Sequence, residues 1–441
     1  MSRVATTKPG LWRQATAMAM QTPQSRNRYV DFLRALSIGA VISGHWLLIA
    51  PQIIDGNLAL SNMLELERWT HWFTWAFQVM PIFFLVGGYA NGVSWNAAIR
   101  QGHNYSEWLN NRLGRLIKPV LPLVLIWAVI GAAGNLLGIR SETLSVASQV
   151  ALVPIWFLCV YIVVALLVPL TWKAWQRYGL TSFWFLALLA IANDALFFAA
   201  GITELGWLNY AFVWLAVHQL GYAWRDGHLS GLRNAATWAI GGALLLFVMT
   251  YFGPYPIAMV SVPGDEVSNT LPPKFAMLAL AMMQIGILLA FESQAQRWLT
   301  RTGPWTATLL INSMIMTIYL WHLTASTLVI GIAWQLGNIG LGAEPGSQLW
   351  WLLRPVWLVV YIVALSLLAA LFHGLERGTT GPLRPISSWR LVSGAMVVCA
   401  GLALLALAGI VGDQWLGLRL YVLCLPFLGA VIAGIQPFQK I

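Results

Sequence analysis

Residues 31–50 read DFLRALSIGAVISGHWLLIA, an apolar run of membrane-spanning length that carries Arg34 and His45. A charged side chain inside a membrane helix is costly, so it is rare unless it serves a site. Eleven helical steps separate the two residues and return to within about 20° of the starting direction, so both lie on one helix face. The rise between them is about 16 Å, which places Arg34 near one membrane surface and His45 at or just beyond mid-depth. A cation at the rim and a proton-transfer group in the interior indicate a donor that enters from one side and reacts within the bilayer.

The composition of the whole chain agrees with a membrane location for this stretch. Hydrophobic residues make up 59% of the 441 residues and charged residues only 9%, and the mean hydropathy is +0.71. These values exclude a soluble domain and predict an all-α integral membrane protein. The apolar runs predict about twelve spanning helices, at residues 31–50, 71–92, 119–138, 148–170, 180–201, 208–224, 234–252, 275–292, 306–334, 349–373, 391–412 and 415–436.

The distribution of charge predicts the orientation. With a cytoplasmic N-terminus, nineteen of the 25 Lys and Arg residues fall on the inner side and acidic residues gather outside. The positive-inside rule then predicts a multi-pass protein of the plasma (inner) membrane with both termini in the cytoplasm. The inner set includes Arg3, Lys8, Arg377, Arg384 and Lys440, and the outer acidic set includes Asp55 and Asp413. This asymmetry explains the net charge of +10, so no nucleic-acid partner is needed.

The chain divides into a cytoplasmic N-terminal segment (1–30), a membrane core (31–375), and two additional C-terminal helices with a tail (376–441). Residues 1–30 lack an apolar run long enough for a signal peptide, so we expect the first helix to act as an uncleaved anchor. Cys159, Cys399 and Cys424 fall in predicted helices with no CxxC or Cys–His spacing. We therefore expect free thiols and neither a disulfide framework nor a metal site.

Five segments in order along the chain carry a resemblance to a known family. The first helix, with Arg, ten residues and His, resembles the start of the acyltransferase-3 family of multipass membrane acyltransferases. Residues 82–89 (IFFLVGGY) are similar to its FFxxSGF segment, and 111–122 (NRLGRLIKPVLP) to its basic RLxRLxxP stretch. Residues 156–158 (WFL) and 318–322 (IYLWH) match two later motifs, so the resemblance covers most of residues 27–375. The last two helices resemble an appendage to a ten-helix core, as in some actinobacterial members.

Two positions depart from the family pattern. Gly87 stands where the family has Ser, so any role of that hydroxyl is absent. Residues 312–317 read NSMIMT where many members have a Ser-Tyr pair, which puts the contacts of that pair in doubt.

The resemblance implies transfer of an acyl group, usually acetyl, from cytoplasmic acetyl-CoA to a hydroxyl of an extracytoplasmic sugar or glycolipid. Because coenzyme A is polyanionic, its phosphates need cations at the inner face, and Arg34, Arg112, Arg115 and Lys118 are placed there. The alternatives are an Asp31–Arg34 ion pair without ligand and an ordinary positive-inside loop at 112–118. Among possible envelope acceptors, a trehalose mycolate is one candidate.

The resemblance makes His45 the expected catalytic base or acyl carrier, and a hydrogen bond between helices is its alternative role. His322 and Tyr319 are expected to bind substrate, although His322 also suits a bridge between helices.

Two further residues are candidates for this site. Asp194 is a second intramembrane charge that can orient the imidazole, bind acceptor hydroxyls, or simply end its helix at the interface. Trp156 suits stacking on the donor or ordinary packing.

A second class of function fits the same residues. A secondary transporter or flippase of an envelope lipid or sugar would use Arg34, His45 and Asp194 as a proton or substrate path. That interpretation predicts substrate movement without acyl transfer, together with an internal repeat, and the sequence contains no strong repeat. A membrane partner protein without chemistry would leave no reason for Arg34 and His45 to share a buried helix face.

Overall fold

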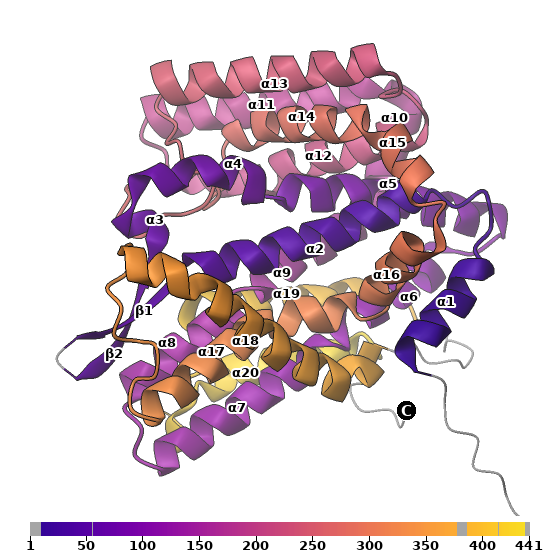
Figure 1. Cartoon of the computed structure of the whole chain (residues 1–441). Coiled ribbons are helices and arrows are strands. Elements are labelled where there is room, and N and C mark those ends of the chain that lie inside the picture. Colours follow the sequence, from indigo (N-terminus) through magenta and orange to yellow (C-terminus); the bar gives the residue numbers. More distant parts are fainter. Residues whose placement is uncertain (1–9, 55, 377–385, 413, 437–441) are drawn as a thin grey trace, which may run out of the picture.

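The computed structural model describes residues 10–54, 56–376, 386–412 and 414–436. The charged residues Arg3, Lys8, Asp55, Arg377, Arg384, Asp413 and Lys440, on which part of the predicted topology rests, lie outside these ranges. The described chain is almost entirely helical, as predicted, and its long helices run in roughly one direction or its reverse (Figure 1). One end of the bundle carries a β-hairpin, and we call it the hairpin end. The opposite end carries α1, and we call it the α1 end.

The elements follow one another along the chain with these bounds. The first half contains α1 (Leu11–Met20), α2 (Arg28–Leu48), β1 (Ile49–Ile54), β2 (Asn57–Asn62), α3 (Met63–Leu66), η1 (Arg68–Phe73), α4 (Thr74–Phe77), α5 (Met80–Arg100), α6 (Tyr105–Ile117), α7 (Val120–Leu136), α8 (Ser141–Leu152), α9 (Ile155–Leu166), α10 (Val168–Tyr178), α11 (Leu180–Ala199), η2 (Glu204–Leu208) and α12 (Asn209–Arg225). The second half contains α13 (Leu232–Phe252), α14 (Ala276–Ala290), α15 (Glu292–Trp298), α16 (Thr302–Ser313), α17 (Ile315–Gln335), α18 (Gln348–Phe372), η3 (His373–Glu376), α19 (Ser388–Ala408), η4 (Trp415–Gly417) and α20 (Leu420–Ile432).

The predicted number of twelve spans is not confirmed. Within the described residues, eight helices are long and apolar enough to cross a membrane, or nine if the bent pair α14–α15 counts as one span. Three predicted spans are outside that set. The helix α2 carries charges in its first turns, α12 has only 17 residues, and α20 has only 13. At about 1.5 Å per residue, α12 and α20 are shorter than a typical hydrocarbon core.

Local sequence explains where α2 begins and ends. Asn27 caps its start by accepting a hydrogen bond from the Tyr29 amide at 3.0 Å. At the other end Ile49 adopts an extended conformation, and the chain continues into the antiparallel hairpin β1–β2. The all-helical prediction missed this hairpin. As a result, His45 lies in the last turn of α2, directly before the hairpin.

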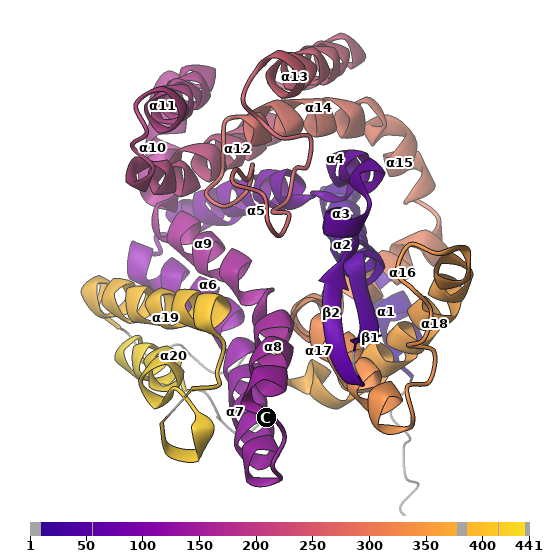
Figure 2. The ribbon, with the colours of Figure 1, turned by 90° about the vertical axis from the view of Figure 1, so that its left-hand side faces the viewer.

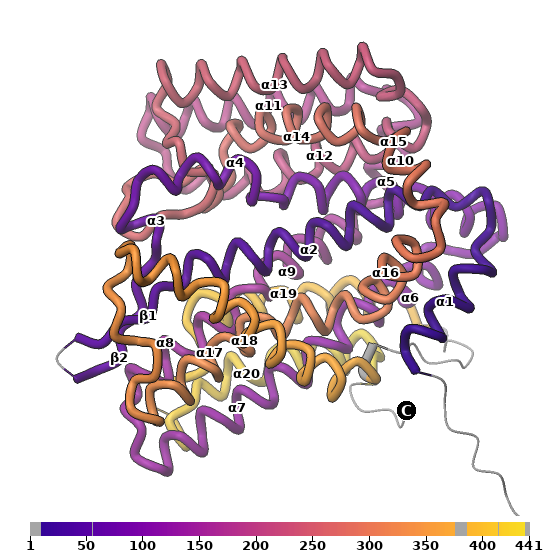
Figure 3. The backbone as a smooth tube through the Cα atoms, in the orientation of Figure 1, coloured from indigo at the N-terminus to yellow at the C-terminus, as the bar shows by residue number. Residues whose placement is uncertain are grey.

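Several predicted helices are divided in the structure. The chain bends by 49° between α14 and α15, which Figure 3 shows as a change of direction of the tube. The predicted helix 306–334 is two helices, α16 and α17, separated at Met314. The predicted helix 71–92 begins as separate short turns before α5, which starts with Pro81 in its first turn. These breaks leave α17, with Tyr319 and His322, as an independent 21-residue helix.

Two glycines allow the backbones of α5 and α12 to approach each other closely. A Cβ on Gly88 of α5 would lie 2.0 Å from the His218 carbonyl oxygen of α12, and one on Gly221 would lie 2.2 Å from the Leu85 carbonyl oxygen. Only glycine permits such a backbone approach, as in small-residue contacts of membrane helices. Gly88 and Gly221 therefore allow close packing of α5 against α12.

The last two helices pack against each other and against the core at α9, α8, α6 and α7 (Figure 2). Cys159 on α9 and Cys399 on α19 meet at this contact, and each thiol lies 3.4–3.5 Å from the other residue's carbonyl oxygen. Both cysteines are free thiols in the structure, as is Cys424.

Candidate functional site

Two histidines from helices far apart in sequence form a pair. His45 Nδ1 of α2 lies 2.8 Å from His322 Nε2 of α17, and the two ring planes differ by only 7°. His322 Nδ1 in turn lies 2.6 Å from the carbonyl oxygen of Tyr319, one turn earlier on α17. A nearly coplanar, short contact of this kind is a well-formed hydrogen bond. The structure therefore joins two of the expected site residues into one chain of hydrogen bonds.

The last member of this chain determines where the protons are. A carbonyl oxygen can only accept, so His322 Nδ1 must carry a proton and donate it. In a neutral ring His322 Nε2 is then an acceptor, and His45 Nδ1 must be the donor. A neutral His45 consequently has an unprotonated Nε2. The pair thus presents one free lone pair, on His45 Nε2, to whatever lies beside it.

Packing holds the pair in position. His322 is completely buried, whereas His45 is partly accessible. The indole N–H of Trp46 donates to the His322 carbonyl oxygen at 3.1 Å, which ties α2 to α17 next to the pair. The Tyr319 hydroxyl donates to the Pro154 carbonyl oxygen at 2.7 Å and so holds the start of α9. Tyr319 therefore serves the pair through its main-chain carbonyl, while its hydroxyl is occupied elsewhere.

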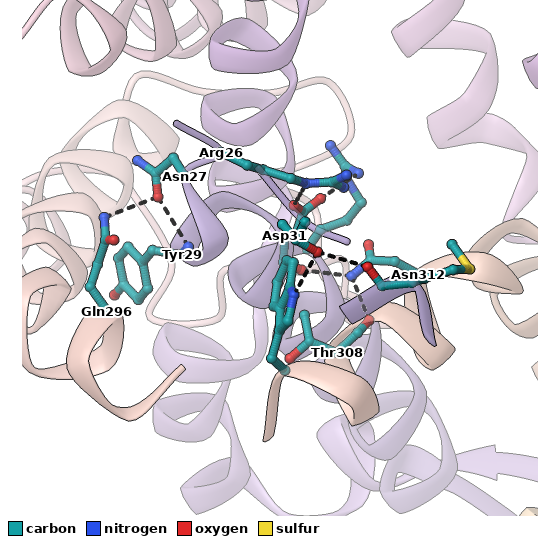
Figure 4. A network of polar contacts seen from close by, with 11 residues as sticks. Arg26, Asn27, Tyr29, Asp31, Gln296, Thr308 and Asn312 are labelled. Carbon is teal, nitrogen blue, oxygen red and sulfur yellow. Dashed lines mark hydrogen bonds and ion pairs between the residues drawn. The ribbon is translucent and has the colours of Figure 1, made fainter. Parts of the chain in front are cut away.

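Arg34 lies near the start of α2, next to Asp31. Figure 4 shows the cluster of charged and polar groups around Asp31. Asp31 forms a close ion pair with Arg26 at 2.7 Å, whereas its other oxygen is 3.6 Å from Arg34 Nη1. The Asn312 amide donates to the Asp31 carbonyl oxygen and to the Thr308 carbonyl oxygen, both at 2.9 Å. Asp31 is thus bound mainly by Arg26. Arg34 keeps 32% of its side-chain surface accessible, and the ion pair with Asp31, which was the alternative to ligand binding, is a loose one.

The cap at the start of α2 extends this cluster. Asn27, which caps the helix, also accepts from the Gln296 amide at 3.1 Å, as Figure 4 shows. These contacts fix α2 to α15 and α16, and so determine the position of Arg34 relative to its neighbours.

Arg112 is a second cation near Arg34. Its Nη2 donates to the Tyr161 hydroxyl at 3.0 Å, and its Nε is buried without a partner among the described residues. The charges of Arg34 and Arg112 are close enough to repel each other. Among the described residues, Asp31 is the one carboxylate paired with either cation, and it is 3.6 Å from Arg34. The two cations therefore leave a surplus of positive charge, which is suited to an anion.

The packing of this cluster explains why position 87 is a glycine where the family has a serine. A Cβ at position 87 would lie 2.7 Å from Tyr161 Cε2 and 3.0 Å from its hydroxyl oxygen. Gly87 therefore makes room for the Tyr161 ring, which brings a hydroxyl to Arg112. A hydroxyl is present after all, carried by another helix.

The remaining basic and aromatic candidates are less closely bound. Arg115 is exposed and Lys118 half-buried, and neither forms an ion pair with another described residue. Trp156 is half-buried, and its ring packs against Phe157 and Tyr210. The alternatives stated for these residues therefore stay open.

Asp194 belongs to a separate cluster. Its carboxylate accepts from the Asn209 amide at 2.8 Å, from the Tyr255 hydroxyl at 3.0 Å and from the Phe275 backbone N–H at 2.6 Å. Among the described residues neither histidine is a partner, so the imidazole of His45 is oriented by His322 and not directly by Asp194. The carboxylate instead anchors the loop between α13 and α14.

Burial changes the pKa of two side chains in the loop between α13 and α14, Lys274 and Tyr255. The side chain of Lys274 is buried with its ammonium 3.6 Å from the Phe197 ring centre. Burial lowers the pKa of Lys274. Burial, together with the nearby Asp194 carboxylate, raises the pKa of Tyr255, so its phenol stays neutral and can donate.

Two contributors were not predicted from sequence. Asp31 was considered only as a partner of Arg34, and Tyr161 was not considered. The only signal for Tyr161 was the exceptional glycine at position 87. Within the described residues, no group of three or more His, Cys, Asp or Glu side chains is arranged to hold a metal ion.

Comparisons with known proteins assign the chain to a family. A family described as acyltransferase domain matches residues 27–374, which is most of the chain and includes both histidines and both arginines. No curated protein and no solved structure matches the chain.

Proposed function

Because this chain belongs to the acyltransferase-3 family, we propose that it is an O-acetyltransferase of the cell envelope, moving acetyl from cytoplasmic acetyl-CoA to a hydroxyl of an extracytoplasmic glycan or glycolipid. The family and the apolar helices make it a membrane acyltransferase in general terms. The observation that carries the finer proposal is the hydrogen-bonded chain from His45 through His322 to the Tyr319 carbonyl oxygen.

The proposed reaction uses the free lone pair of His45. Its Nε2 takes the proton of the acceptor hydroxyl as the oxygen attacks the thioester carbonyl carbon. The C–O bond forms, the C–S bond breaks, and the coenzyme A thiolate then takes the proton from Nε2. His322 accepts the Nδ1–H of His45 and stabilises the imidazolium that forms in between, as the third member of a catalytic triad does. A covalent relay would use the same Nε2 as a nucleophile and pass through an acetyl-imidazole.

The donor would lie along α2 from Arg34 to His45. Arg34 and Arg112 would bind coenzyme A phosphates, with the more exposed Arg115 and Lys118 nearby in sequence. The distance to His45 is about 16 Å of helix rise, which the extended pantetheine arm would bridge. Trp156 would contact this arm or the adenine.

The acceptor would approach from the hairpin end, because His45 lies in the last turn of α2 before β1. The positive-inside charge distribution supports the assignment of that end to the outer side. A sugar or glycolipid hydroxyl is the acceptor class that we propose, and a trehalose mycolate is one such molecule.

The test uses the full chain in nanodiscs with acetyl-CoA labelled in the acetyl group. We would measure thioester loss and label on added envelope lipids for the wild type, His45→Ala and Arg34→Gln. His103→Ala, in an exposed turn, is the matched histidine control. We expect turnover to fall at least a thousandfold in His45→Ala, the KM for acetyl-CoA to rise in Arg34→Gln, and the control to match the wild type.

Two results would contradict the proposal. Equal turnover by the wild type and His45→Ala would remove His45 from the chemistry. Neither binding nor consumption of acetyl-CoA by folded wild-type protein, over several acceptors, would favour the transporter and call for transport assays in vesicles.

A further inference from the structure

One face of α18 carries a buried row of polar-tipped side chains. Trp350, Arg354, Trp357 and Tyr361 follow one another at spacings of four, three and four residues, so they lie on one side of the helix. Their exposed fractions are 1%, 4%, 8% and 0%. Nothing in the reaction described above uses this row.

Arg354 is a buried cation whose charge is not neutralised. Its Nη1 donates to the Ile49 carbonyl oxygen at 3.1 Å, and its guanidinium carbon lies 3.7 Å from the Trp350 ring centre. No carboxylate of the described residues forms an ion pair with it, and its Nε is buried without a partner. Burial of a charge without a counter-charge is costly, and one carbonyl oxygen uses only one of five N–H groups.

The neighbours of Arg354 also have unused donors. Trp350 Nε1 and the Tyr361 hydroxyl are both buried without a hydrogen-bond partner among the described residues. An indole N–H can only donate, and a phenol can donate. Arg354 is the charged member of the three and lies between the other two along α18, so its unused donors favour an acceptor with negative charge. A phosphate or a carboxylate has that chemistry, and guanidinium groups bind both in a bidentate manner.

The location of this row connects it to the histidine pair. Ile49, whose carbonyl oxygen binds Arg354, is four residues beyond His45, which corresponds to about 6 Å along α2 toward the hairpin end. The Tyr361 ring packs on Trp46 with 5.4 Å between ring centres, and Trp46 donates to the His322 carbonyl oxygen. Arg354 therefore lies about one helical turn from the base, on the side opposite to Arg34.

We propose that Arg354, flanked on α18 by Trp350 and Tyr361, binds an anionic group of the acceptor, a phosphate or carboxylate located about one helical turn from the hydroxyl that is acylated. This assignment rests on the proposed function and narrows its acceptor class: the acceptor is an acidic envelope molecule, so a neutral glycolipid such as a trehalose mycolate is set aside. Arg34 then binds the phosphates of the donor, and Arg354 binds the anionic group of the acceptor.

The test compares Arg354→Gln and Arg354→Lys with the wild type in nanodiscs supplied with labelled acetyl-CoA. An envelope lipid extract, separated by anion exchange into neutral and acidic fractions, provides the acceptors. Arg140→Gln is the matched control, because Arg140 is an exposed cation at the hairpin, bonded to Asn57. Inorganic phosphate serves as a separate probe, by inhibition of transfer and by thermal shift.

We expect the acidic fraction to be labelled, and kcat/KM for that fraction to fall at least tenfold in Arg354→Gln, with partial recovery in Arg354→Lys. The KM for acetyl-CoA should not move. Inorganic phosphate should compete with the acceptor in the wild type but not in Arg354→Gln, and Arg140→Gln should behave as the wild type.

Three outcomes would overturn the assignment. Equal labelling of the neutral fraction by the wild type and Arg354→Gln would exclude an acidic acceptor. Stabilisation by inorganic phosphate without any preference for acidic acceptors would assign the site to a free anion. Failure of the wild type to consume acetyl-CoA at all would instead overturn the proposed function, and the assignment with it.

Discussion

Replacement of His322 by Phe tests the hydrogen-bonded pair most directly. Phe retains a flat ring in the same buried space but leaves His45 Nδ1–H without the acceptor that now lies 2.8 Å away. A hydrogen bond to a group that becomes charged contributes about 1.5–3 kcal/mol, which corresponds to roughly 10- to 150-fold in rate. A free His45 also divides between its two tautomers, so we expect kcat to fall by about a hundredfold with the KM for acetyl-CoA unchanged.

The assay measures single-turnover label transfer in nanodiscs for the wild type, His322→Phe and His322→Gln. The Gln amide oxygen can accept from His45, so His322→Gln should recover part of the lost rate. Ser326→Ala is the matched control, since Ser326 is buried one turn away and bonds only main-chain carbonyl oxygens.

A second measurement separates positioning from packing. In ¹⁵N-histidine spectra, the wild type should show one unprotonated nitrogen on His45, at Nε2, and His322→Phe should show a mixture of tautomers. Activity of folded His322→Phe within threefold of the wild type would refute the argument, as would an unchanged His45 spectrum.

Three other substitutions give sharp expectations. Gly88→Ala should lower the unfolding temperature strongly, because overpacking costs about 1–3 kcal/mol or more, whereas Gly39→Ala, with open space around it, should not; equal melting curves would argue against the close helix crossing. Gly87→Ser should displace the Tyr161 ring and raise the KM for acetyl-CoA, and a double-mutant cycle with Tyr161→Leu should show coupling; independent effects would contradict the contact. Burial lowers the pKa of Lys274, so the folded chain binds fewer protons than the unfolded chain below pH 10.5. The free energy of unfolding should therefore increase as the pH rises toward 10.5. In thermal melts, Lys274→Met should show a weaker dependence of stability on pH.

Helix periodicity and charge were sufficient to predict part of the site. The eleven-residue spacing already placed Arg34 and His45 on one face of a helix, because helical geometry is local. His322 was expected to bind substrate or to bridge helices, but no local rule indicates that two rings 277 positions apart form a hydrogen bond. The tautomer followed only from the Tyr319 carbonyl oxygen, which is a main-chain group that any residue would supply.

Contacts between distant segments explain what the sequence could not predict. Asp194 bonds to three groups that lie 15 to 81 positions further along the chain. Arg354 forms no ion pair with a described carboxylate, and this could not be predicted because distances between distant segments cannot be read from one sequence. The hairpin was missed although Asp55-Gly56 is a common hairpin-turn dipeptide, because the flanking residues continue the apolar composition of α2.

The carbonyl oxygen at the end of the histidine pair has a consequence for energy coupling. A proton that enters at His45 Nε2 cannot leave beyond His322, since the Tyr319 oxygen can accept a hydrogen bond but does not pass a proton on. The proton must therefore return through the atom that received it and leave on the departing thiolate. In the proposed orientation each turnover carries one acetyl group outward and one hydrogen inward, with no net movement of charge. The equilibrium of the reaction should then be the same at any membrane voltage, with the thioester as its only driving force.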